Sequence, residues 1–312
     1  MTAGSVGQIA ALATAVAWTI TALAFEHAAK RIGAIALNFL RLAVGFILLG
    51  LWGLATKGAF LPLDAPGGAW LWLSASGVAG LVIGDLLLFQ AFIDVGSRVS
   101  MLVYASAPAL TAVLGFAILG ERLGAASLGG MALTLAGITL VVLGRGAPEG
   151  KDAPQDRAGS ASAAAPAARR ARGIVLAFGA ALGQAGGLIL SKIGAGHMDP
   201  FAGTQIRVSA AMLCFGIIVA VAGAGGGVIS ALRDRKAVAS LTVGSFFGPF
   251  LGVSLSLLAV QSTKAGIAAA IMSIMPVLII APYALIYGER VKAREILGAI
   301  AAVAGVFVLF LV

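Results

Sequence analysis

Three charged side chains lie well inside long apolar stretches of this sequence, and they are the residues best able to do chemistry there. Arg41 lies in FLRLAVGF, Arg207 in QIRVSAAM and Asp85 in GLVIGDLLLF. A charge in a hydrocarbon interior is costly unless it faces a cavity or a partner. The two arginines are therefore candidate anchors for an anionic or carboxylate group, or parts of gates. The alternative is that each bonds to backbone carbonyls near a helix end.

Asp85 has two interpretations. The one we favour is an ion pair with Arg41 that locks the first half of the chain. The other is a buried group that takes up and releases protons. The residue aligned with Asp85 in the second half is Val253, so Arg207 has no matching acid and is freer to meet a solute.

Uncharged polar residues extend this set. Asn38 and Arg41 share one face of a predicted helix, and Tyr104 lies on a polar stripe with Ser100 and Thr111. Trp18 and Gln184 occupy corresponding places in the two halves of the chain. The candidate binding or gating residues are therefore Arg41, Arg207, Asp85, Trp18, Gln184, Asn38 and Tyr104.

The elements that hold these residues are membrane-spanning helices. Of the 312 residues, 60% are hydrophobic and only 11% are charged, with a mean hydropathy of +1.06. Such a composition cannot coat a water-facing surface and excludes a soluble enzyme. Apolar runs long enough to cross a bilayer predict ten spans. They cover residues 6–25, 34–54, 69–93, 98–119, 126–144, 173–191, 201–223, 238–260, 266–287 and 295–312.

The two halves of the chain repeat each other. Arg41 aligns with Arg207, and Pro108 with Pro276; each of these prolines precedes a GER motif and two trailing glycines in the same register. An odd number of spans per repeat inverts the second half, a design common in secondary transporters. We therefore predict an all-α integral membrane fold of ten helices in two inverted five-helix repeats. The repeats are residues 1–144 and 173–312, joined by a flexible basic linker, 145–172.

Basic residues are distributed unevenly between the predicted loops. With the N-terminus on one side, the opposite side receives fifteen of the 21 Lys and Arg residues and the near side only four. The positive-inside rule then places both termini outside and the linker in the cytoplasm of a bacterial-type inner membrane. The net charge of +9 is explained by this asymmetry, so we expect no nucleic-acid partner.

Motifs for other chemistry are missing from the sequence. There is no nucleotide-binding GxxxxGK[ST] and no cluster with metal-ligand spacing, so we expect no cofactor, no metal and no enzyme activity. The GER motifs fall at turns, where we expect them to cap helix ends. Two other function classes stay open: an integral membrane enzyme acting on a lipid-linked substrate, and a non-transporting scaffold.

Taken together, these features resemble the EamA family of the drug/metabolite transporter superfamily. The resemblance rests on the repeated five-span pattern, Trp18, the paired arginines, the paired prolines and the GER motifs. It implies a solute carrier, commonly an exporter of amino acids or related metabolites, with spans five and ten at the periphery. Two departures are Thr19 after Trp18, where the family often has Gly, and Glu26 at a Lys position that Lys192 keeps in the second half.

We therefore predict a secondary transporter that moves a small organic solute out of the cell by alternating access. Its expected partners are that solute, the lipid bilayer, and protons as a candidate coupling ion. The substrate and the oligomeric state are not specified by the sequence.

Overall fold

The computed structural model describes residues 3–144, 164–280, 282 and 292–311, and the elements assigned there are all helical. Within those residues, eight helical segments are long and apolar enough to cross a membrane. Two shorter apolar stretches, Ala107–Leu119 and Ala265–Leu278, cover parts of the predicted fourth and ninth spans. The predicted all-helical membrane architecture is therefore confirmed, and eight of the ten predicted spans are matched by a full-length helix.

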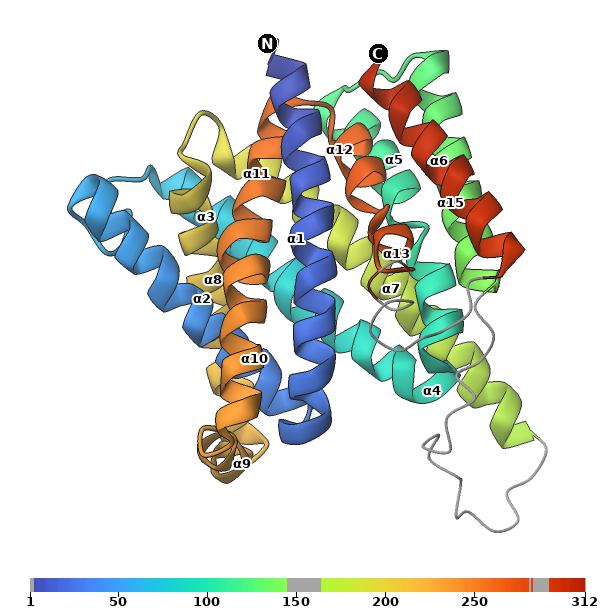
Figure 1. The fold of residues 1–312 in the computed structure, drawn as a ribbon. Coiled ribbons are helices and arrows are strands. Elements are labelled where there is room, and N and C mark those ends of the chain that lie inside the picture. Colours follow the sequence, from blue (N-terminus) through green and yellow to red (C-terminus); the bar gives the residue numbers. More distant parts are fainter. Residues whose placement is uncertain (1–2, 145–163, 281, 283–291, 312) are drawn as a thin grey trace.

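The helices follow one another in corresponding order in the two halves (Figure 1). The first half contains α1 (Ala3–Ile32), α2 (Ala34–Lys57), α3 (Gly67–Ser76), η1 (Gly77–Gly84), α4 (Asp85–Tyr104), α5 (Ala107–Leu119) and α6 (Ala125–Gly144). The second contains α7 (Ala164–Ala195), α8 (Pro200–Val221), α9 (Gly225–Ala231), α10 (Arg235–Ser245), η2 (Phe246–Gly252), α11 (Val253–Ser262), α12 (Ala265–Met272), α13 (Met275–Leu278) and α15 (Ala293–Phe310).

Contacts between the halves obey an approximate twofold relation. Helix α1 packs against α10, η2 and α11, and the equivalent α7 packs against α3 and η1. Two further pairs join equivalent elements directly, α2 with α8 and α6 with α15, and α5 of the first half packs against α12 of the second. Figure 1 shows both chain termini at one end of the bundle, which we call the terminus face; α6 ends and α7 begins at the opposite end, the linker face.

A stretch of π-helix interrupts the third predicted span of each half. It covers Gly77–Gly84 in η1 and Phe246–Gly252 in η2, and each ends on a glycine directly before the aligned residues Asp85 and Val253. Gly252 permits the close approach of α1, while Gly84 lies at ordinary contact distance from α7. A Cβ at Gly252 would lie 2.8 Å from the Trp18 indole nitrogen, and one at Gly84 would lie 3.7 Å from the Gln184 backbone nitrogen.

A proline interrupts the helix at equivalent places in the two halves. Helix α4 ends at Tyr104 and α5 starts just before Pro108, while α12 ends at Met272 and α13 starts just before Pro276. A proline has no N–H to donate to the carbonyl four residues earlier, so the helix restarts there. The sequence predicts a loop at 94–97 instead, but α4 runs through those residues.

The start of α7 also differs from the prediction. Residues 164–172, the end of the predicted linker, form the first turns of this helix. Alanine and arginine are strong helix formers, and Arg169 and Arg172 pair with the nearly buried Asp94 of α4 at 3.9 and 3.4 Å. Residues 145–163 of the predicted linker lie outside the described residues.

The trailing glycines of the GER motifs join α6 to α15. A Cβ at Gly298 would lie 2.6 Å from the Gly137 carbonyl oxygen, and one at Gly305 would lie 2.7 Å from that of Gly130. The two backbones therefore touch directly, as small residues allow in membranes. Figure 1 places this pair at the edge of the bundle, where the family resemblance expects it.

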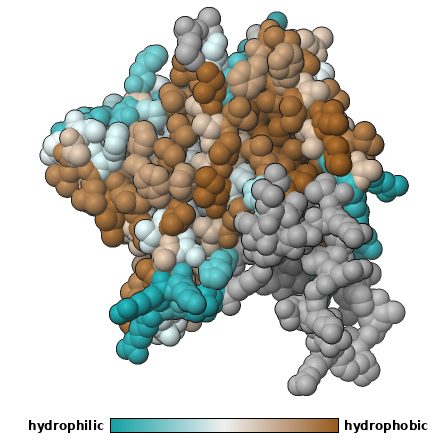
Figure 2. All heavy atoms as spheres, viewed as in Figure 1, coloured by the Kyte–Doolittle hydropathy of each residue, from teal (hydrophilic) through white to brown (hydrophobic). Residues whose placement is uncertain are grey.

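The outer surface is apolar around the middle of the bundle. Many large hydrophobic side chains are exposed, including Ile47, Val113 and Phe307. Figure 2 shows this apolar surface in brown across the visible face, with hydrophilic side chains gathered near α9 at the linker face. This distribution suits a helical bundle surrounded by lipid.

Candidate functional site

A cavity of about 90 Å³ lies where the two halves meet. Its lining comes from α1, α4, α5, α6, α7, α12 and α13, so it belongs to neither repeat alone. Most of its wall consists of residues in equivalent places of the two halves. These are Trp18 with Gln184, Met101 with Ala269, Tyr104 with Met272, Ala105 with Ser273, Ala107 with Met275, and Pro108 with Pro276.

The cavity wall is largely apolar, with few polar groups. Two hydroxyls of the wall already donate to backbone carbonyls nearby in sequence. Thr111 donates to the Ala107 carbonyl at 2.8 Å, and Ser273 donates to the Ala270 carbonyl at 2.7 Å. The groups best placed to orient a solute are then the Trp18 indole, the Tyr104 hydroxyl and the Gln184 amide. An apolar wall with a few orienting polar groups is typical of small-molecule sites.

The expected ion pair between Arg41 and Asp85 is present. The Arg41 guanidinium donates through Nη2 to the Asp85 carboxylate, and both side chains are mostly buried. The guanidinium also lies 5.9 Å from the centre of the Phe25 ring, within cation–π range. Asp85 directly follows Gly84, the last residue of η1, and a Cβ at Gly84 would lie 3.7 Å from the backbone nitrogen of the cavity residue Gln184. The pair therefore adjoins the cavity without lining it.

Arg207 occupies a different environment. Its side chain is 4% exposed, and its Nε and Nη1 atoms have no hydrogen-bond partner among the described residues. Its backbone packs against Gly77 of η1. Neither Arg207 nor the buried Asn38 lines the central cavity. The structure thus brings Trp18, Tyr104 and Gln184 together, pairs Arg41 with Asp85 beside them, and leaves Arg207 and Asn38 apart.

A charge cluster at the terminus face ties the two halves together. Lys192 Nζ lies 2.5 Å from the Glu121 carboxylate and also donates to the Thr263 carbonyl at 2.5 Å. Glu121 accepts a 2.8 Å hydrogen bond from the backbone N–H of Ala265, at the start of α12. Lys264 donates to the Arg122 carbonyl at 2.6 Å. The first GER motif therefore caps a helix as predicted, but a helix of the other half.

Glu121 and Lys192 are not among the candidate functional residues that the sequence predicts. Lys192 was noted only for its family position near a span end, and Glu121 only as a capping residue. The equivalent second motif, residues 288–290, lies outside the described residues. No pattern in the sequence pairs these two residues, which lie 71 positions apart at the ends of the fourth and sixth spans.

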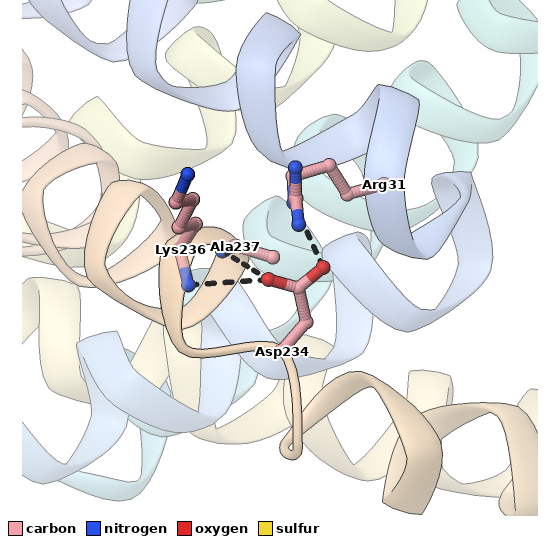
Figure 3. A network of polar contacts seen from close by, with 4 residues as sticks. All are labelled: Arg31, Asp234, Lys236 and Ala237. Atoms are coloured by element: carbon pink, nitrogen blue, oxygen red, sulfur yellow. Dashed lines mark hydrogen bonds and ion pairs between the residues drawn. The ribbon is translucent and has the colours of Figure 1, made fainter.

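A second contact between the halves lies at the linker face (Figure 3). Asp234, the N-cap of α10, accepts from Arg31 Nε at 2.8 Å and from the backbone N–H groups of Lys236 and Ala237 at 3.1 and 3.0 Å. These hydrogen bonds, that from Arg31 foremost, lower the pKa of the Asp234 carboxyl below its usual value. Both ends of the bundle thus carry an ion pair that joins one half to the other.

No group of three or more His, Cys, Asp or Glu side chains able to hold a metal occurs among the residues that the structure describes. The site consists of an apolar cavity, a neighbouring ion pair and two charged contacts at the bundle ends. Such an arrangement can bind and enclose a small molecule.

Comparison with known proteins identifies the family. The EamA-like transporter family matches this chain twice, over residues 5–143 and 171–311. The chain belongs to the EamA-like transporter family. A solved structure described only as "Crystal structure of protein" shares the fold with a TM-score of 0.71, covering 97% of this chain and 94% of that chain at 17% identity. No curated protein matches the chain significantly.

Membership of the EamA family and the apolar helices make this a multi-pass membrane protein with a transporter fold. Because this is a family of transporters, the cavity of such a protein is expected to bind a solute and does not need catalytic side chains.

Proposed function

We propose that this protein is a secondary transporter that exports a small organic solute, an amino acid or related metabolite, by alternating access. The observation that carries the proposal is the composition of the central cavity, whose wall is drawn from equivalent positions of both repeats. A site on the axis that relates two repeats keeps its shape when one repeat rocks against the other. The solute can therefore meet the same wall from either side.

Ten spans in two inverted repeats are part of this proposal. The two shorter apolar stretches would serve as the fourth and ninth spans, broken near Pro108 and Pro276 beside the cavity. Residues 1–144 and 173–312 would form the moving units. We place both termini outside the inner membrane and the linker in the cytoplasm, following the basic loops.

The charged contacts at the two faces would act as alternate closures. Opening the terminus face requires Lys192 to leave Glu121, and opening the linker face requires Arg31 to leave Asp234. Protons are our candidate coupling ion, with Asp85 as the group that carries them when Arg41 moves away. Arg207 is a buried cation with no ion pair among the described residues, and it would receive an anionic group of the solute during the cycle.

Solute counterflow in proteoliposomes tests the proposal. Vesicles preloaded with each member of a panel of amino acids and metabolites should accumulate the labelled form of at least one of them. A Gln184→Leu variant should bind that solute about tenfold more weakly, because one hydrogen bond is lost. A Gln8→Leu control loses only a bond from its amide to the Leu309 carbonyl, far from the cavity, and should leave the apparent affinity unchanged. Absence of flux for every member, with the fold intact, would support the scaffold alternative.

A further inference from the structure

A second, larger cavity of about 350 Å³ lies away from the central one, between the end of α2 and the start of α8. Its third wall is the loop 58–66, on the left of Figure 1. No residue lines both cavities. Since α2 belongs to the first half and α8 to the second, a ligand held here would contact both halves at the terminus face.

The cavity is a built feature of the fold. The loop folds back onto α2, because Gly50 leaves room for the Phe60 ring and a Cβ at Gly53 would lie 2.7 Å from the Ala59 carbonyl. Phe60 packs edge-on against Phe46, with ring centres 5.3 Å apart. The loop is therefore fixed on its helix, and the hollow beside it persists.

Aromatic side chains and hydrogen-bond acceptors share the wall of this cavity. Trp52 and Phe201 stack at 5.1 Å on one side, and Phe60 lies in the loop. Gln205 is 2% exposed; its Nε2 contacts the Phe46 and Phe60 carbonyls at 3.3 and 3.5 Å, but its Oε1 has no hydrogen-bond partner among the described residues. A buried acceptor without a donor favours a ligand that brings one.

The charges of the wall favour the same kind of ligand. Asp64 and Asp199 are acidic, and Lys57 is the one basic residue of the lining, so the site carries a net charge of −1. Lys57 pairs with Asp199 at a loose 3.4 Å, while Asp64 has no ion pair among the described residues. Carboxylates and an unpartnered amide oxygen all accept hydrogen bonds, and aromatic faces attract cations.

From this geometry we infer that the α2–α8 cavity binds an organic ammonium group attached to an apolar body. The ammonium donates to Asp64, Asp199 and Gln205, and the apolar body lies against Trp52, Phe60 and Phe201. Two sources share this chemistry: a free amine or amino acid, and the headgroup of an ethanolamine phospholipid. The site is separate from the proposed transport cavity, so its occupancy is measured without any transport assay.

Calorimetric titration of the purified full-length protein in phosphatidylcholine nanodiscs tests the inference. The probe is 2-phenylethylammonium, with the neutral 2-phenylethanol and the anionic 3-phenylpropionate as matched controls. We expect saturable binding of the ammonium compound, and binding of the two controls at least about fivefold weaker, as loss of one charged contact predicts. Equal affinity for all three compounds would overturn the inference.

Two exposed charges give variants with opposite expected signs. Asp64→Asn should weaken the binding of 2-phenylethylammonium about fivefold, whereas Lys57→Met should strengthen it, because the competitor for Asp199 is gone. Trp18→Ala alters the central cavity and should not change this affinity. A drop caused by Trp18→Ala, or no response to either charge variant, would contradict the assignment. Nanodiscs with phosphatidylethanolamine separate the sources: competition with the probe indicates the lipid headgroup, and unchanged affinity indicates a soluble amine.

Discussion

Lys192 on α7 lies 2.5 Å from the carboxylate of Glu121, which follows α5, and so joins the second half of the chain to the first. The pair is mostly buried, and Glu121 in turn caps the start of α12. Three helices of the cavity wall, α5, α7 and α12, therefore depend on one ion pair at the terminus face. The positions equivalent to Glu121 and Lys192 cannot form such a pair at the linker face, because Glu26 stands at the position equivalent to Lys192. The Arg31–Asp234 pair at that face uses other positions.

Removing one partner of this pair should be costly. Lys192→Met leaves the Glu121 carboxylate without its ammonium, and we expect a loss of about 1–3 kcal/mol in the free energy of unfolding. The check is thermal unfolding in detergent. The double variant Lys192→Glu with Glu121→Lys exchanges the two charges and should recover part of the lost stability. If the double variant loses as much stability as the two single variants added together, the ion pair does not stabilise the fold.

The Arg41–Asp85 pair makes a similar prediction inside the bundle. Asp85→Asn leaves a buried guanidinium without a counter-charge, so we expect a loss of about 3 kcal/mol in the free energy of unfolding. The double variant Arg41→Met with Asp85→Leu removes both charges and should be more stable than Asp85→Asn alone. Proton coupling is measured separately: Asp85→Asn should keep counterflow but lose uptake driven by a pH gradient. Gradient-driven uptake at the wild-type rate would exclude Asp85 as the coupling group.

Two glycines on α6, Gly129 and Gly137, offer a matched comparison. A Cβ at Gly137 meets the Gly298 carbonyl at 2.5 Å, so Gly137→Ala should force α6 from α15 and cost about 1–3 kcal/mol. A Cβ at Gly129 meets nothing within 4 Å, so Gly129→Ala should be neutral or stabilise the helix by about 1 kcal/mol. Equal unfolding temperatures for the two variants would show that the α6–α15 contact is not as close as described.

Asp234 gives a pH-dependent prediction at the linker face. Its pKa is lowered in the folded state, so its contribution to stability is complete above the unfolded pKa and is lost as pH falls through the folded pKa. Asp234→Asn keeps an N-cap side chain but not the ion pair with Arg31. The unfolding temperature of the wild type should therefore exceed that of the variant down to about pH 4, and the difference should shrink below it. A difference that stays constant to lower pH would assign it to another cause.

Much of the architecture follows from sequence patterns that act locally. Hydropathy specifies where the chain lies in lipid, and the aligned prolines specify where helices restart. The Arg41–Asp85 pair was predictable because two opposite charges at similar depth in an apolar medium have few alternatives. The twofold alignment likewise placed Trp18 opposite Gln184, and both line the central cavity.

Other features depend on packing that no local pattern reveals. The Glu121–Lys192 contact joins residues of different halves. The π-helical turns before Asp85 and Val253 likewise match no local pattern that the sequence analysis used. The helical start of α7 inside the predicted linker depends on Asp94, a residue of another helix. The α2–α8 cavity exists because a loop folds back onto two glycines, a match of shapes that composition does not encode.

Access to the central cavity from each face tests alternating access most directly. Ser273→Cys introduces one thiol into the cavity wall, in a Cys214→Ser background that removes the single native cysteine. A membrane-impermeant maleimide is then applied from either side of proteoliposomes, with and without a transported solute. We predict labelling from both faces, with the solute changing the two rates in opposite directions. Labelling from one face only, under every condition, would contradict the account.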